Sequence, residues 1–231
     1  DYANLRATLK GRSLGVPLER MLVNLGTVPA EEFTGPLEQL PRFLSQVAVS
    51  LASDEEHAVT VEEIDATVEH AEFADLIETA RASKSGALKE LAGLMVDAAN
   101  TRTAIRARRR GRSASELAAT LFPGGSFGLD TIESAYTLSV AELVDAIAAM
   151  PGLGGVDVAS LADPSTLDVV LDNLIARFLR SARAMQFGPE PVIAYVMARE
   201  AEVIAVRTLL IGRLAGLDRE VLRSRLRELY V

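Results

Sequence analysis

Residues 97–121, DAANTRTAIRARRRGRSASELAATL, carry the pattern that decides the fold, and two other stretches repeat it without a gap. Residues 1–25 read DYANLRATLKGRSLGVPLERMLVNL, and residues 202–226 read EVIAVRTLLIGRLAGLDREVLRSRL. The second copy starts 96 residues after the first and the third starts 105 residues after the second, whereas solenoid repeats have periods of about 20–50 residues. The spacing therefore indicates a small helical subdomain that is present three times.

Each copy has an acid, two arginines, a glycine and two apolar residues at constant spacing. These positions are Asp1, Arg6, Arg12, Gly15, Met21 and Leu25 in the first copy, Asp97, Arg102, Arg108, Gly111, Leu117 and Leu121 in the second, and Glu202, Arg207, Arg213, Gly216, Leu222 and Leu226 in the third. A repeated polar pattern of this kind, without a catalytic motif, favours a mechanical or assembly role.

Composition narrows the class of protein. The 231 residues are 49% hydrophobic and 24% charged, which is enough apolar material to bury a core. The chain has no Cys, so disulfides and thiolate metal sites are excluded and an intracellular compartment is the default. A net charge of −8 argues against a nucleic-acid partner. The longest dense apolar stretch, residues 192–198, is far short of the ~20 residues of a membrane span.

Helical periodicity dominates and strand signals are almost absent, so we predict an all-α fold. Two amphipathic outer helices are expected at residues 61–82 and 167–185. Three more apolar inner helices are expected at residues 1–12, 87–110 and 191–215, each ended by the repeated Gly, and the last is expected to be buried on several sides. Further helices are expected at residues 17–25, from 37 or 42 to 52, at 129–136, at 140–149 and at 218–230, where Asp218 is the expected cap.

The repeat also predicts a division into subdomains. We expect a remainder of a first subdomain at residues 1–55, a second at 56–158 and a third at 159–231. The first copy lacks a counterpart of residues 86–96, so we expect this chain to be the C-terminal part of a longer protein, with about one ~100-residue subdomain upstream. A surface uncovered in this way would favour a dimer of the truncated chain.

The repeated first arginine lies on an apolar helix face in the second and third copies, at Arg102 and Arg207. A guanidinium is rarely buried there without a partner, and Asp65 and Asp168 on the outer helices are the expected carboxylates. The favoured interpretation is an ion pair that fixes helix packing, in which case Arg207→Met should cost more than ~2 kcal/mol. The alternative is an arginine in a shared central cavity that grips a partner.

A dense basic run closes the second inner helix, at Arg106, Arg108, Arg109, Arg110 and Arg112. The favoured interpretation is a solvated helix C-terminus, where cations complement the helix dipole. The functional alternatives are contact with an acidic protein partner or with an anionic membrane surface. Nucleic acid is disfavoured because no aromatic residues interleave with the arginines.

Catalytic and metal-binding patterns are weak. The two histidines are His57 and His70, and His70 with Glu69, Glu72 and Asp75 gives one imidazole among surface carboxylates without HExxH spacing. No nucleophile elbow or locally supported Ser-His-Asp triad is present. We therefore predict no catalytic residue, no cofactor and no metal site.

Several stretches carry a resemblance to a known family. Residues 187–217, FGPEPVIAYVMAREAEVIAVRTLLIGRLAGL, with residues 225–231, RLRELYV, resemble the C-terminus of the C subunit of V/A-type ATP synthases, the counterpart of the d subunit of the eukaryotic V-ATPase. Residues 96–105, VDAANTRTAI, and residues 1–9, DYANLRATL, resemble the family's earlier copies of the same motif. One departure is that Ala205 stands where the other copies have Asn4 and Asn100.

The resemblance implies a fold and a role. It implies three helical subdomains in a pseudo-threefold, funnel-like arrangement, with most of the first missing here. It also implies a peripheral, non-catalytic rotor subunit of the central stalk, on the cytoplasmic face of the membrane. Its partners would be the central-shaft subunits and the membrane proteolipid ring, coupled to ATP-linked proton or sodium transport.

Two other interpretations stay open from the residues alone. One is an unrelated helical-repeat scaffold that binds acidic partners through residues 106–112. The other is an enzyme, which the lack of any catalytic motif disfavours.

Overall fold

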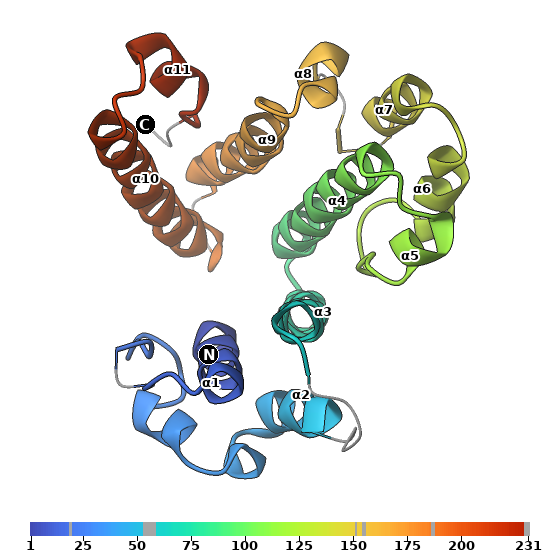
Figure 1. Ribbon diagram of the computed structural model, residues 1–231. Coiled ribbons are helices and arrows are strands. Elements are labelled where there is room, and N and C mark those ends of the chain that lie inside the picture. Colours follow the sequence, from blue (N-terminus) through green and yellow to red (C-terminus); the bar gives the residue numbers. More distant parts are fainter. Residues whose placement is uncertain (19, 53–58, 151, 154–155, 186–187, 229–231) are drawn as a thin grey trace. The chain divides into compact units, whose positions relative to one another are not determined.

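The computed structural model describes residues 1–18, 20–52, 59–150, 152–153, 156–185 and 188–228, and among these residues all regular structure is helical (Figure 1). The all-α prediction is confirmed. Chain contacts divide the protein into two compact units, Asp1–Thr79 and Ala80–Val231. The three-subdomain division and its pseudo-threefold arrangement stay predictions, and residues 53–58, which hold the first expected boundary and His57, lie outside the described ranges.

The first unit is built from α1, α2 and most of α3, with two 3-10 turns. Its elements are α1 (Tyr2–Leu14), η1 (Ala30–Thr34), η2 (Leu37–Gln39), α2 (Arg42–Ala52) and α3 (Val61–Ala82). Prolines at 29, 36 and 41 keep the segment before α2 in short pieces, because proline cannot donate a backbone hydrogen bond. Leu5, Phe33, Leu44 and Val68 lie at the centre of the core that joins these elements.

The second unit holds the remaining helices, and α9 lies between α4 and α10 (Figure 1). Its elements are α4 (Gly86–Arg109), α5 (Ala114–Ala118), α6 (Leu129–Tyr136), α7 (Val140–Ala148), α8 (Val158–Ala162), α9 (Leu167–Ser181), η3 (Ala182–Ala184), α10 (Glu190–Leu214) and α11 (Arg219–Ser224). The main core gathers α4 to α9 around fully buried residues such as Ile105, Leu117, Ile147 and Leu171.

The repeated glycine ends each inner helix, as predicted. Gly15, Gly111 and Gly216 have φ of 64°, 69° and 72°, the left-handed region that an L side chain rarely adopts. Each inner helix closes with the six-to-one backbone bond of a Schellman turn. These bonds run from Val16 N to Gly11 O (2.8 Å), from Arg112 N to Ala107 O (3.1 Å) and from Leu217 N to Gly212 O (2.9 Å).

Side-chain caps begin several of the shorter helices. Ser113 and Glu116 form a capping box at α5, and Ser139 with Glu142 forms a second one at α7. Hydrogen bonds from the serine lower the pKa of Glu116 and of Glu142. An unpredicted short helix, α8, begins where the side chain of Asp157 accepts from Ser160 N.

The expected helix at residues 17–25 is wrong for the described residues of that stretch. Only a turn forms there, with Leu22 N donating to Leu18 O at 3.3 Å. The backbone of Val23 bonds to the side chain of Asn4 instead of to a preceding helical turn. A long-range polar contact therefore replaces the local helix.

Two expectations for the C-terminal part are also wrong. The inner helix α10 is not buried on several sides, because Val192, Val203 and Leu214 are 65%, 65% and 89% exposed. The last helix, α11, ends at Ser224 rather than near residue 230, and Asp218 makes no side-chain cap bond. The chain leaves the helix there because residues 227 and 228 bind α9, as described below.

Candidate functional site

The repeated positions of the inner helices form four kinds of contact in the first two copies, and together they make the candidate site. The first is an amide clamp on the loop that follows the helix. Asn4 donates to Val23 O (2.7 Å) and accepts from Val23 N (2.9 Å). Asn100 does the same with Phe122, at 2.8 Å for both bonds. In each copy one side chain therefore satisfies both polar groups of one loop residue.

The repeated acid holds the next part of the same loop. Asp1 accepts from Val28 N (3.0 Å) and from the hydroxyl of Thr27. Asp97 accepts from Ser126 N (3.0 Å) and from its hydroxyl. Asp97 is 0% exposed, and this burial raises its pKa although the hydrogen bonds from Ser126 oppose the shift. The acid is a structural anchor of the loop in both copies.

The repeated first arginine pairs with a carboxylate of the outer helix. In the first unit, Arg6 lies 3.5 Å from Asp65, and Lys10, one turn further along α1, lies 2.6 Å from the same carboxylate. Arg6 also reaches Glu72 at 3.2 Å, two turns along α3. Arg6 and Lys10 therefore share the carboxylate of Asp65, and Arg6 also contacts Glu72.

The second unit repeats this geometry. Arg102 and Arg106 each lie 2.7 Å from Asp168, and Arg102 also reaches Asp172 at 3.0 Å. The side chain of Arg102 is 26% exposed, so the pair is half-buried between α4 and α9. The structure places Arg102 in an ion pair that joins two helices, which is the favoured sequence interpretation.

The repeated second arginine caps carbonyl groups further along the chain. Arg12 donates to the carbonyls of Phe33 (3.3 Å) and Gly35 (2.5 Å) at the end of η1. Arg108 donates twice to Leu138 O (3.1 and 2.9 Å) after α6, and its guanidinium lies 5.8 Å from the centre of the Tyr136 ring. A cation at the C-terminal end of a helical turn complements its partial negative charge.

The basic run at the end of α4 is largely used within the fold. Arg106 binds Asp168 and Arg108 binds Leu138, as above. Arg109 lies close enough to Asp163 to help lower its pKa, after the larger effect of hydrogen bonds from Ser165. Arg110 and Arg112 have exposed side chains. Arg106 and Arg108 are therefore engaged within the fold, Arg109 has only this weak electrostatic contact, and Arg110 and Arg112 remain for an external acidic partner.

The third copy makes none of these contacts among the described residues. Glu202 pairs with Arg199 of its own helix, and Ala205 has no amide with which to hold a loop. Arg207 is exposed, and no ion pair joins it to a described residue. The side chain of Arg213 is likewise exposed. Because no described residue supplies a carboxylate to Arg207, the contacts of the described chain give no basis for the expected loss of more than ~2 kcal/mol on Arg207→Met.

The segment after α11 binds α9 instead of α10. Arg227 lies 2.9 Å from Asp172, and Glu228 N donates to Asn173 Oδ1 at 2.7 Å. The carboxylate of Glu228 also pairs with Arg177 (2.7 Å) and with Arg180, and the hydrogen bond from Arg177 is the largest effect that lowers its pKa.

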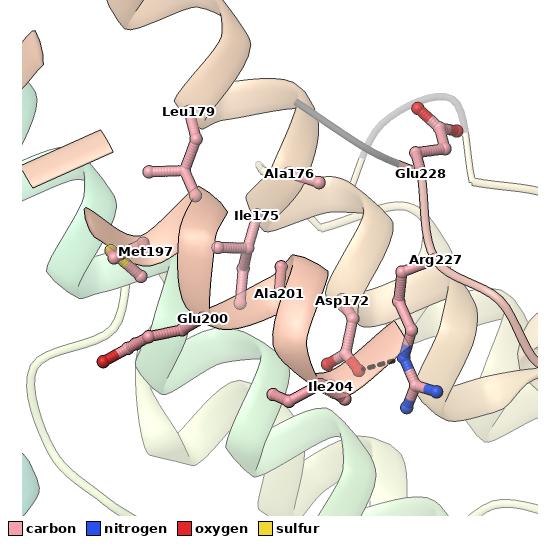
Figure 2. Close-up of a pocket in the computed structure, with 10 residues that line it drawn as sticks. All are labelled: Asp172, Ile175, Ala176, Leu179, Met197, Glu200, Ala201, Ile204, Arg227 and Glu228. Carbon is pink, nitrogen blue, oxygen red and sulfur yellow. Dashed lines mark hydrogen bonds and ion pairs between the residues drawn. The ribbon is translucent and has the colours of Figure 1, made fainter. Parts of the chain in front are cut away.

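A groove of about 220 Å³ lies between α9, α10 and this segment. Figure 2 shows Ile175 and Ile204 lining it from α9 and α10, with the Asp172–Arg227 pair at one end. The lining is mostly apolar. Asp172, Arg227 and Glu228 are held in ion pairs, whereas Glu200 makes no ion pair with a described residue.

Neither a metal cluster nor a membrane-spanning helix forms in the described part of the chain. No three His, Asp or Glu side chains gather there in a way that could hold a metal ion, and the group around His70 does not converge. Within the same ranges, no helix combines the length and the apolar character that crossing a bilayer requires.

Some contact residues were not singled out from the sequence. Lys10 is one of them, although it occupies the same repeat position as Arg106, so the signal that could have found it is the recurrence of a cation at a fixed offset. Asn4 and Asn100 stand out in the sequence as a matched pair, but their contacts with the loop do not. The loop residues that the asparagines hold show no such recurrence and could not be found in this way.

Comparison with known proteins places this architecture in a family. The C subunit of the A-type ATP synthase of Desulfurococcus sp. (strain SY) is 26% identical over 221 residues, which cover 90% of this chain and 60% of that protein. The C subunit of the V-type ATP synthase of Thermus thermophilus is 27% identical over 231 residues, covering 95% of this chain and 69% of that protein. The C subunit of the V-type sodium ATPase of Enterococcus hirae is 27% identical over 138 residues, covering 58% of this chain and 42% of that protein.

The chain therefore spans 60% of the Desulfurococcus protein and 69% of the Thermus protein. The family described as ATP synthase (C/AC39) subunit matches residues 1–225, nearly the whole chain. On this match, the protein belongs to the ATP synthase (C/AC39) subunit family, as a C subunit of the V/A type.

Proposed function

We propose that the protein is a non-catalytic rotor subunit of the central stalk of a V/A-type ATP synthase. In this role it is a socket that joins the central-shaft subunits to the membrane proteolipid ring during ATP-linked proton or sodium transport. It would lie at the cytoplasmic face of the membrane as a peripheral subunit. Membership of the family and the names of its relatives support this proposal.

Among the contacts, the ion pairs that join an inner helix to an outer helix support the proposed role most strongly, because they occur twice. A socket that passes torque has to resist shear between its helices. Two cations on one aspartate, at Asp65 and again at Asp168, tie each pair of helices at a fixed register. Hydrogen-bonded charge pairs of this kind set geometry more than they add stability.

The subdomain organisation is part of the same proposal. We propose subdomains at residues 56–158 and 159–231 and the remainder of a first at 1–55, in a pseudo-threefold funnel. The glycine stop recurs at the same repeat position in all three copies, and the two arginine contacts recur in the first two, which supports this proposal.

A co-elution experiment tests the binding role. The chain and the purified central-shaft subunits are mixed near physiological salt and separated by size exclusion. The proposal predicts a stoichiometric complex that persists when salt is raised. Its control is the double variant Arg110→Glu with Arg112→Glu, which removes two exposed arginines that follow α4 and form no ion pair with a described residue.

The alternative of a scaffold for acidic partners predicts a different pattern. It predicts that the chain binds polyglutamate as well as the shaft subunits, and that the double variant and high salt abolish both. Failure of the native chain to bind the shaft subunits at all would contradict the socket.

A further inference from the structure

The inner helix α10 exposes a face whose counterparts are covered in the second copy. Val203 and Leu210 are 65% and 59% exposed, whereas Ala98 and Ile105, at the matching repeat positions of α4, are 1% and 0% exposed. Ile211, at 54%, and Val206, at 56%, extend the same face. Large exposed apolar patches on a helix usually mark a surface that another element covers.

The face surrounds an arginine whose counterparts are paired. Arg207 lies in a shallow hollow of about 470 Å³, together with Arg199, Glu202, Val203, Val206, Leu210 and Ile211. Its counterparts Arg6 and Arg102 each meet an aspartate of an amphipathic helix that packs on the inner helix. Arg207 therefore occupies the repeat position of this ion pair, but no described residue supplies the carboxylate.

One sequence difference between the copies indicates which kind of helix the exposed face of α10 would bind. The second cation of the pair, Lys10 or Arg106, is replaced by Ile211. A partner helix would therefore place one carboxylate on Arg207 and an apolar side chain over Ile211, where the earlier copies have a second charge contact. An anionic membrane surface fits less well, because Glu202 lies beside Arg207 on this face.

We propose that this face of α10 binds an amphipathic helix of the same kind as α3 and α9, with an Asp or Glu on Arg207. The helix would be supplied from outside these 231 residues, and the greater length of the Desulfurococcus and Thermus relatives leaves room for it. The inference does not depend on the rotor role. It rests on the charge of Arg207, on the apolar residues around it, and on the two copies in which the matching arginine pairs with an aspartate.

A tethered helix tests the proposal. A second copy of residues 60–82, which hold Asp65, is fused after residue 231 through a Gly/Ser linker of about 20 residues, with a reach of about 25 Å. The chain has no Cys, so Val206→Cys gives a single thiol on the α10 face. The thiol-labelling rate should fall by at least about tenfold in the fusion relative to the unfused chain, because the helix covers position 206.

Charge variants make the test specific. Arg207→Glu in the fusion should restore labelling to within about twofold of the unfused chain, and Asp65→Lys in the appended helix should then recover protection. Arg213→Glu, an exposed arginine on the same helix, is the matched control and should leave protection unchanged. Circular dichroism of each variant checks that the helices remain folded.

Three results would overturn the proposal. One is an unchanged labelling rate in the fusion, and another is protection that survives Arg207→Glu. The third is an unfused chain that is already protected in a concentration-dependent way and sediments as a dimer, which would make a second copy the occupant of this face.

Discussion

Asp168 illustrates how a single residue can set the register of two helices. It accepts from Arg102 and Arg106, one turn apart on α4, so a shift of α9 by one turn would break both contacts. The carboxylate is 35% exposed, so water screens part of the attraction and the pair adds less stability than a fully buried one. Its main effect is on geometry, and the same arrangement at Asp65 serves α1 and α3.

Replacing Asp168 by Ala should destabilise the protein. The change leaves Arg102 without one of its carboxylates and should lower the free energy of unfolding by about 1–2 kcal/mol, measured by urea denaturation. Asp145→Ala, at an exposed position of α7, is the control and should change it by less than about 0.5 kcal/mol. Equal effects of the two substitutions would mean that the pair has no special role.

The buried Asp97 should make stability depend on pH. Burial raises its folded-state pKa above the ordinary value of 3.8, so the unfolded chain loses this proton first as pH rises. The contribution of Asp97 to the free energy of unfolding is therefore largest below 3.8 and falls as pH rises through the folded-state pKa. Asp97→Asn removes the titration.

Urea unfolding of the native chain and of Asp97→Asn, followed from about pH 3 to about pH 7, measures this contribution. The native chain should lose stability relative to the variant as pH rises. A relative gain in stability over the same range would show that the hydrogen bonds from Ser126 outweigh burial.

At the scale of elements, local signals predicted most helices and missed those that long-range contacts decide. The ranges of α2, α3 and α6 follow from periodicity and from flanking proline, serine and glycine. The false helix at 17–25 had an acceptable local pattern, but the amide of Asn4, 19 residues away, holds Val23. The early end of α11 likewise reflects bonds to Asp172 and Asn173, which no local pattern reveals.

The glycine that ends α4 should matter for its backbone conformation alone. Gly111 has φ of 69° and open space where a Cβ would lie, so Gly111→Ala introduces strain without a clash. It should lower the free energy of unfolding by about 1 kcal/mol, measured by thermal or urea denaturation. Gly128→Ala is the matched control, since Gly128 also has open space but has φ of −68°, and it should be near neutral. A neutral Gly111→Ala would contradict the left-handed stop.

At the scale of the whole molecule, the repeat itself could be predicted, and so could the family, from the stretches at residues 96–105 and 187–217. The exposure of α10 could not be predicted, because its sequence matches that of a buried inner helix and only the three-dimensional contacts distinguish the two cases. In the first two copies the repeated arginine meets a carboxylate, and in the third it meets none among the described residues. The sequence pattern is the same in all three and so does not reveal this difference.

The proposed role is that this protein joins a rotating shaft to a membrane ring without chemistry of its own. Capture of a detergent-solubilised proteolipid ring on immobilised central-shaft subunits, with and without the chain, tests it most directly. We expect the ring to be retained only when the chain is present, and we expect that adding the chain produces no ATP turnover in the absence of the catalytic subunits. Retention of the ring without the chain, or a failure of the chain to bridge the two, would contradict it.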